Sequence, residues 1–209
     1  MLLFSRQVTL TGSPKRTLPW ATEITAYVNS HSSLDVSLWA SNFGYPLGTM
    51  AWTAMVESQS QLAAGTASLL ADPGYLDLID GAADLVTTPG EDQLAELIHG
   101  TPGEPGGIGS IAQVTTAAAI VDQMASAIGF AVDIAQHIEG VTGTPIFVLT
   151  SLFGGMGGVS WISVQPDMEA VDMARAKMQT DSSYLDRVAK TKGLFIPGSG
   201  HVSQAVRVA

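Results

Sequence analysis

The histidines of this 209-residue chain are its only side chains that normally titrate near neutral pH. Two of them have positions that suit chemistry: His137 falls in a predicted helix, and His201 begins a predicted last strand. Either imidazole could act as a general base or as an axial ligand of haem. The alternative for each is a surface or hydrogen-bonded histidine with no chemical role. His137 and His201 are therefore the candidate catalytic residues, and because no His, Asp and Glu residues have metal-ligand spacing, we predict no metal site.

Other side chains could form the wall of a ligand pocket. The six candidates are Tyr27, Trp39, Asn42, Trp52, Trp161 and Arg175. Trp52 and Trp161 have the same place in two similar stretches, and a flat indole could stack on an aromatic guest or simply fill a helix–sheet core. Trp39 and Asn42 are three apart on a predicted strand, so they point to opposite faces unless a bulge intervenes. Asn42 also suits a turn-stabilising role.

The composition argues against some classes of partner. The formal net charge is −10 and the pI is about 4.5, so the chain would repel a phosphate backbone and we expect no nucleic-acid binding. Apolar residues make up 46% and charged residues 13%, with a mean hydropathy of +0.27. This much apolar surface must be buried against a second half, an apolar ligand or another subunit, and we expect a homo-oligomer. Because the sequence has no cysteine, disulfides, thiolate metal sites and a cysteine nucleophile are ruled out.

No targeting or membrane-spanning segment is predicted. The first residues, "MLLFSRQVTLTG", lack the basic start and the long apolar core of a secretory signal. The most apolar later segment, residues 111–138, is interrupted by aspartate and glutamine side chains and is too polar to span a bilayer. We therefore expect a soluble, cytoplasmic protein.

The chain contains an internal repeat. "SNFGYPLGTMAW" (residues 41–52) is echoed by "SLFGGMGGVSW" (residues 151–161). An offset of 110 residues aligns residues 20–44 with residues 130–154 without a gap. An offset of 109 then aligns the tryptophan of each stretch and the later segments "DPGYLDLI" and "DSSYLDRV". The matches keep the same order throughout, which indicates a tandem duplication of a domain-sized unit.

Each copy has the pattern of a ferredoxin-like unit. Alternating residues, helical spacing and turn residues predict the order β-α-β-β-α-β, with the repeated stretch as the hairpin between the second and third strands. Such a unit has a four-stranded antiparallel sheet with helices on one face only. Two tandem copies can cover each other's open face, which predicts an α+β barrel. The predicted boundaries are a first unit at 1–99, a Gly/Pro linker at 100–110 and a second unit at 111–209.

The strand-then-helix segment of each copy resembles a known family. "LGTMAWTAMVESQSQLAAGTASLLADPGYLDLI" resembles NIPSNAP-like proteins of the dimeric α+β barrel superfamily, and "VSWISVQPDMEAVDMARAKMQTDSSYLDRV" resembles them more loosely. The resemblance implies a pseudo-dimeric barrel with a ligand between the sheet and the helices of one unit. It also implies a range of functions: cofactor-free oxygenases of aromatic polyketides, haem-binding and haem-degrading enzymes, isomerases and binding proteins.

The leading hypothesis is a pocket for an apolar or aromatic small molecule, with cofactor-independent oxygenation or isomerisation as its candidate chemistry. Two alternatives stay open: a structural or assembly subunit with no chemistry, and haem binding through one histidine. Under the leading hypothesis no cofactor is needed.

The two copies differ in their polar residues. His137 stands where the first copy has Tyr27, Arg175 replaces a threonine, and His201 is aligned with Gln93. These changes add proton donors or positive charge to the second copy. We therefore expect chemistry or anion binding in the second copy, with the first copy as an apolar site or scaffold.

Overall fold

The computed structural model describes residues 1–86, 89–103 and 106–209, and it contains the two predicted units. The first consists of β1 (Leu2–Thr9), α1 (Pro14–His31), β2 (Val36–Phe43), β3 (Thr49–Val56), α2 (Gln59–Leu70), α3 (Pro73–Asp80) and β4 (Glu91–His99). The second consists of β5 (Ile111–Ala118), the short 3-10 helix η1 (Val121–Gln123), α4 (Met124–Thr142), β6 (Ile146–Phe153), β7 (Gly158–Gln165), α5 (Met168–Thr180), α6 (Ser182–Ala189) and β8 (His201–Arg207). The β-α-β-β-α-β order is confirmed in both.

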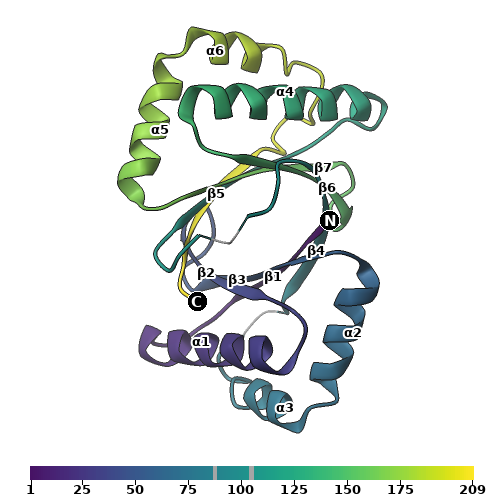
Figure 1. Ribbon diagram of the computed structural model, residues 1–209, viewed down its shortest axis with the longest axis vertical. Coiled ribbons are helices and arrows are strands. Elements are labelled where there is room, and N and C mark those ends of the chain that lie inside the picture. The colour runs from purple at the N-terminus through teal and green to yellow at the C-terminus, as the bar shows by residue number, and fades with distance from the viewer. Residues whose placement is uncertain (87–88, 104–105) are drawn as a thin grey trace.

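The strands close into one antiparallel barrel with the order β1-β3-β2-β8-β5-β7-β6-β4 (Figure 1). The last strand of each unit pairs with the other unit, β8 beside β2 and β4 beside β6. Half a turn around the barrel exchanges β1 with β5, β3 with β7, β2 with β6 and β4 with β8, so the pseudo-twofold axis runs along the barrel. The helices lie outside, in two layers on opposite sides of the barrel. No helix among the described residues is long and apolar enough to cross a membrane.

Strand register tests which residues of the two units are equivalent. Trp52 pairs with Leu38 in the first unit and Trp161 pairs with Val148 in the second, as the duplication predicts. The predicted match of His201 with Gln93 is wrong. His201 pairs with Thr116 of β5. In the first unit the residue equivalent to Thr116 is Gln7 of β1, and it pairs with Glu91. The loops before β4 and β8 differ in length. Aligning the two copies on their Pro-Gly pairs therefore shifts β8 relative to β4 and gives the wrong partner for His201.

Glycines fix the hairpin in the repeated stretch. Gly44 and Gly48 have φ of 92° and 84°, a region that disfavours residues with a Cβ atom. A Cβ atom at Gly48 would lie 2.3 Å from the carbonyl oxygen of Leu10, and one at Gly44 would lie 2.5 Å from that of Val202. The hairpin tip therefore docks closely at both of its ends. This requirement explains the glycine in the repeated sequence pattern.

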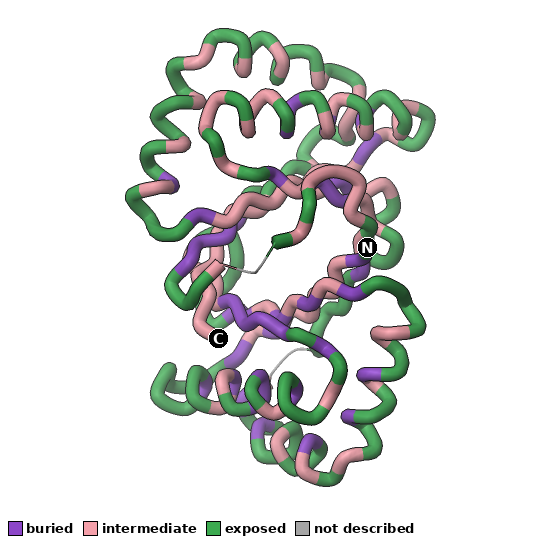
Figure 2. Tube along the Cα trace, viewed as in Figure 1, coloured by how far each residue is buried: buried purple, intermediate pink, exposed green. Residues whose placement is uncertain are grey.

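The two units are buried to different extents. The helix-covered face of the first sheet holds the larger apolar cluster, which includes Leu38, Trp52 and Val56, and the smaller cluster of the second unit centres on Ala131 and Val148. Figure 2 shows buried residues on α1 to α3 and on the strands beneath them, while α5 and α6 are mostly half-buried or exposed. The first unit therefore provides more of the apolar packing.

Candidate functional site

A cavity of about 520 Å³ lies between α2 and strands β1 and β4 of the first unit. It is lined by Phe4, Gln59, Leu62, Ala63, Thr66, Ala67, Leu70, Asp92, Gln93, Leu94 and Phe153. Its volume falls in the range of small-molecule sites, and its lining has the usual mixture of apolar walls and a few polar groups. We call this space the α2 cavity.

Local packing of α2 explains why this space is open. The helix begins at Ser58, whose side chain accepts a hydrogen bond from the amide of Gln61. Its Gly65 lies against Leu34, where a Cβ atom would approach the Leu34 Cγ to 2.7 Å, so this side of the helix packs closely on the core. The neighbouring side presents Ala63 and Ala67, whose short side chains line the cavity. Small residues on this side of the helix therefore leave the space beside the sheet open.

An ion pair stands at the polar side of the α2 cavity. Arg6 donates through Nε and Nη2 to the two oxygens of Asp92, each at 2.7 Å, and these hydrogen bonds raise the pKa of Arg6 above its usual value. The two side chains are 43% and 48% exposed, so the pair contributes little stability. The two-point contact instead fixes the orientation of the carboxylate. Asp92 is the only carboxylate among the described residues that line the cavity.

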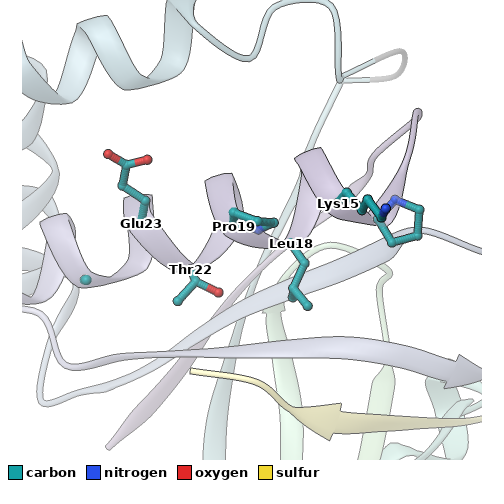
Figure 3. Close-up of a pocket in the computed structure, with 7 residues that line it drawn as sticks. Lys15, Leu18, Pro19, Thr22 and Glu23 are labelled. Carbon is teal, nitrogen blue, oxygen red and sulfur yellow. The ribbon is translucent and has the colours of Figure 1, made fainter.

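A second hollow, of about 720 Å³, runs along the outer side of α1 (Figure 3). Its lining comes from this one helix and includes Lys15, Leu18, Pro19, Thr22 and Glu23, most of them exposed. A ligand there would contact protein on one side only. The α2 cavity is also an open groove, with seven exposed residues in its lining, but its walls come from a helix and from a sheet. A ligand there would contact protein on more than one side, so the α2 cavity is the better candidate site.

Tyr27 and His137 have equivalent positions and equivalent contacts, which they make away from the sheet. The hydroxyl of Tyr27 donates to both oxygens of Asp72 at 3.0 Å, and Nε2 of His137 lies 3.0 Å from Oδ2 of Asp181. Each aspartate caps the following short helix, α3 or α6. His137 also lies 3.1 Å from the hydroxyl of Ser183. The structure therefore gives Tyr27 and His137 the role of joining two helices, and neither is among the residues that line the α2 cavity.

Hydrogen bonds to these caps make the fold sensitive to acid. The pKa of Asp181 is lowered chiefly because the hydroxyl of Ser183 donates to it. Burial would raise the pKa of Asp72, but hydrogen bonds from Tyr27 and the amide of Gly74 outweigh it, and the pKa is lowered. A carboxylate with a lowered pKa stabilises the fold above its unfolded pKa of about 3.9, and this contribution is lost as the pH falls through the folded value.

We therefore expect the unfolding free energy to fall between pH 5 and pH 2.5, and to fall less in Asp181→Asn, which is already destabilised at pH 5. Urea titrations of both proteins across this range measure the effect. An equal fall in both proteins would remove Asp181 from the explanation.

The three predicted pocket tryptophans are all hydrogen-bonded within the protein. Nε1 of Trp52 donates to the hydroxyl of Thr25 on α1 at 2.8 Å, and Nε1 of Trp161 donates to the carbonyl of Ala131 on α4 at 3.0 Å. Both therefore join a sheet to its first helix. Trp39 points the other way, into the barrel, where its Nε1 donates to Thr53 at 3.0 Å. None of the three lines the α2 cavity.

The remaining predicted residues are dispersed. Asn42 is half-buried and lies where the pairing of β2 with β8 shifts register between Ser41 and Phe43, so the bulge left open by the sequence is present. Arg175 is exposed on α5, and no described residue forms an ion pair or hydrogen bond with it. His201 faces the barrel interior with its ring 4.9 Å from that of Tyr45. The structure thus does not bring the predicted site residues together.

Sequence reasoning missed Asp92, Arg6 and the cavity-lining side of α2. The spacing of Leu62, Thr66 and Leu70 indicates that they share one side of a helix. The same spacing is equally typical of a helix side that packs in the core. No sequence pattern joins Arg6 to Asp92, which are 86 residues apart. The α2 cavity lies mainly in the first unit, with Phe153 from β6 of the second, whereas the sequence favours the second copy for chemistry, and that expectation stays a prediction.

The histidines do not fit a haem site. No histidine is among the described residues lining the α2 cavity. Nε2 of His137 lies within hydrogen-bonding distance of Asp181 and Ser183, and the ring of His201 packs against that of Tyr45, with Nε2 buried at the barrel interior. An axial ligand needs an open side next to a space that holds the macrocycle. We therefore assign no step to haem.

Comparisons with solved structures support the dimeric α+β barrel fold. A Fusobacterium nucleatum protein provisionally described as a monooxygenase matches 100% of this chain and 92% of its own, with a TM-score of 0.74 and 11% identity. An anthrone oxidase-like protein matches 100% and 91%, with a TM-score of 0.71 and 13% identity. A Lactobacillus acidophilus protein, also provisionally described as a monooxygenase, matches 99% and 93%, with a TM-score of 0.67 and 12% identity.

The comparisons do not show which protein family the chain belongs to. No family model matches the chain, and no curated protein matches it. A NIPSNAP domain protein from Burkholderia xenovorans covers 50% of this chain at 17% identity, and its TM-score of 0.40 is too low to support the resemblance. At these identities the similarity establishes the fold alone, and membership of the NIPSNAP-like group stays a prediction.

Proposed function

We propose that this protein binds an apolar or aromatic small molecule in the α2 cavity and oxygenates it without a cofactor. The observation that carries the proposal is the cavity itself: about 520 Å³, with apolar walls from a helix and a sheet and one oriented carboxylate. The full-length similarity to the anthrone oxidase-like protein supports the choice of a flat tricyclic substrate, because both chains have the same fold. Anthrone is therefore the substrate to test first.

The side chains suggest how such a reaction would proceed. The apolar walls, with Phe4 and Phe153, would hold the rings, and Asp92 would accept a proton from the activated CH₂ group of anthrone. Dioxygen would then oxidise the resulting carbanion, placing one oxygen atom in the new ketone while the other leaves as water. Arg6 would act as a positioning residue, because its two hydrogen bonds fix the Asp92 carboxylate.

Replacing Asp92 by asparagine tests this assignment. A positioned general base contributes about 10²- to 10⁴-fold to a rate, so we expect Asp92→Asn to lower kcat for anthrone oxidation by at least about 100-fold. Oxygen consumption and the absorbance of the anthraquinone product measure the rate. Glu96→Gln is the matched control: Glu96 lies on the same side of β4, is exposed and does not line the cavity. A similar loss in both variants, or in neither, would contradict the role of Asp92.

Assembly into a homo-oligomer stays a prediction, supported by exposed apolar residues at the hairpin tips. Leu47 is 90% exposed and Phe43 66% in the first unit, and Met156 is 79% exposed in the second. Because the pseudo-twofold axis runs along the barrel, both tips lie at the same end of it. Apolar surface gathered in this way is typical of contacts between subunits.

A further inference from the structure

Small side chains line part of the interior of the barrel, between larger inward residues such as Trp39 and Met55. Trp52 points to α1, so its neighbours on β3, Ala51 and Thr53, point inward. Thr53 pairs with Ser5 of β1, whose side chain therefore points inward as well. In the second unit Trp161 points to α4, so Ser160 points inward from β7. An eight-stranded barrel is just wide enough for side chains to fill, so small residues at these positions leave space beside them.

Solvent reaches this interior in the middle of the strands. On β3 the helix-facing residues Met50, Trp52, Ala54 and Val56 are all buried, whereas Ala51, Thr53 and Met55 between them are only half-buried. The inward residues Ser5, Ala95, Ser160 and Ile162, from strands on both sides of the barrel, are half-buried too. Since all strand edges are paired, exposure at mid-strand comes from inside the barrel.

The interior carries hydroxyl groups and little charge. Ser5, Thr53 and Ser160 lie between apolar inward residues, and the charged inward residues lie at strand ends: Glu91 at the start of β4 and Arg207 at the end of β8. Arg207 already donates to the backbone carbonyls of Gly106 and Ala209. A neutral hydrogen-bonding molecule suits such a lining better than an ion does.

Three buried side-chain polar atoms of the described residues lack a partner, namely the hydroxyl of Ser41, Nε2 of His201 and Oε1 of Gln204, and the first two face the barrel interior. Ser41 and His201 occupy inward positions, since Ser41 follows Trp39 by two residues and His201 pairs with the inward Thr116. Buried polar atoms are almost always satisfied by protein, water or ligand. The two inward atoms therefore indicate a polar occupant inside the barrel.

We infer that the barrel encloses a solvated lumen that binds a small neutral molecule rich in hydroxyl groups, separate from the α2 cavity. The inward serine and threonine hydroxyls supply donors and acceptors, and His201 and Ser41 supply two free hydrogen-bonding positions. The inference does not rest on the proposed oxygenase activity: of the described residues that line the α2 cavity, Gln93 alone has an inward position, as the partner of Ser5.

The absence of cysteine from the sequence allows a direct test of the lumen. Single cysteines are introduced as Ser5→Cys and Ser160→Cys, on opposite sides of the lumen, and as Ala54→Cys, a 2% exposed control facing the helices. Each folded variant is treated with the small neutral reagent methyl methanethiosulfonate and followed by mass spectrometry. We expect the two lumen cysteines to react about 100-fold faster than the control, which reacts only through local opening. If all three cysteines were equally protected from the reagent, the inference of a solvated lumen would be wrong.

Xylitol then tests the class of ligand. Xylitol at twice its dissociation constant should slow modification of Ser5→Cys and Ser160→Cys by about threefold, because occupied lumen excludes the reagent. Ser60→Cys, at an exposed position on α2, reports any general effect of xylitol on the reagent and should be unaffected. Reactive lumen cysteines that no concentration of xylitol protects would overturn the assignment of a neutral polyhydroxyl ligand.

Discussion

Replacing Ala67 by tryptophan should weaken the binding of anthrone by about 100-fold or more, equivalent to about 2.8 kcal/mol. Ala67 lies on α2 and lines the cavity across from Phe4 and Leu94 of the sheet. An indole at this position would occupy the space that the ligand needs. Because α2 is a surface helix, the indole can be accommodated without disturbing the core beneath Gly65 and Leu69. Titration calorimetry under nitrogen measures binding without turnover.

The duplication supplies a matched control for this variant. Ala176 is the equivalent residue of α5, one offset of 109 residues along the chain, and it is exposed. Ala176→Trp adds the same side chain to the second unit, so we expect it to leave the affinity for anthrone unchanged. Loss of binding in Ala176→Trp, with binding retained in Ala67→Trp, would move the ligand from the first unit to the second.

Removing the indole of Trp52 should destabilise the protein by about 3–5 kcal/mol, the range for truncating a large buried aromatic residue. Trp52 is 9% exposed and contacts the ring of Trp20 edge-on, with centroids 6.1 Å apart. Its Nε1 donates to Thr25, whose hydroxyl in turn donates to the carbonyl of Ala21 on the same helix. Trp52→Ala would leave a cavity in the larger apolar cluster and break this chain of hydrogen bonds.

Trp161→Ala should cost clearly less than Trp52→Ala. Trp161 has the same place in the second unit, but it is only half-buried and packs against a smaller apolar cluster. Its Nε1 bonds directly to the backbone, because Ala135 stands where the first unit has Thr25. Urea unfolding of both variants gives the two free energies. Equal costs would contradict the difference in packing between the units.

The sequence predicts the architecture because the duplication gives each feature twice. Glycines at the hairpin recur at an offset of 110 and then 109 residues, tryptophans on the third strand and aspartates before the short helices recur at 109, and a single topology satisfies both copies. The alignment fails before β4 and β8, where the offset changes again: it matches His201 with Gln93, whereas strand pairing matches His201 with Glu91.

The candidate site is predicted much less well than the fold. Trp52, Trp161, Tyr27 and His137 recur in both copies because they hold helices to sheets and to each other, and this structural role makes them conspicuous in the sequence. The α2 cavity depends instead on the small size of the side chains at Ala63 and Ala67. It also depends on the contact of Arg6 with Asp92, which only strand pairing creates.

The added polar groups of the second copy are separated in space. His137 contacts the cap of α6, His201 faces the barrel interior, and Arg175 projects from α5. These side chains come from different faces of their unit, so residue type alone could not indicate that they form no common site. In the second unit, Gln204 of β8 takes the place that Leu94 has in the lining of the α2 cavity. The two units have therefore diverged in the polarity of this position.

A crystal structure of the protein grown with anthrone under nitrogen tests the proposed site most directly. We expect density for the three fused rings between α2 and strands β1 and β4, with the CH₂ carbon next to the carboxylate of Asp92. Anthrone bound inside the barrel or in the second unit, with the α2 cavity empty, would contradict it.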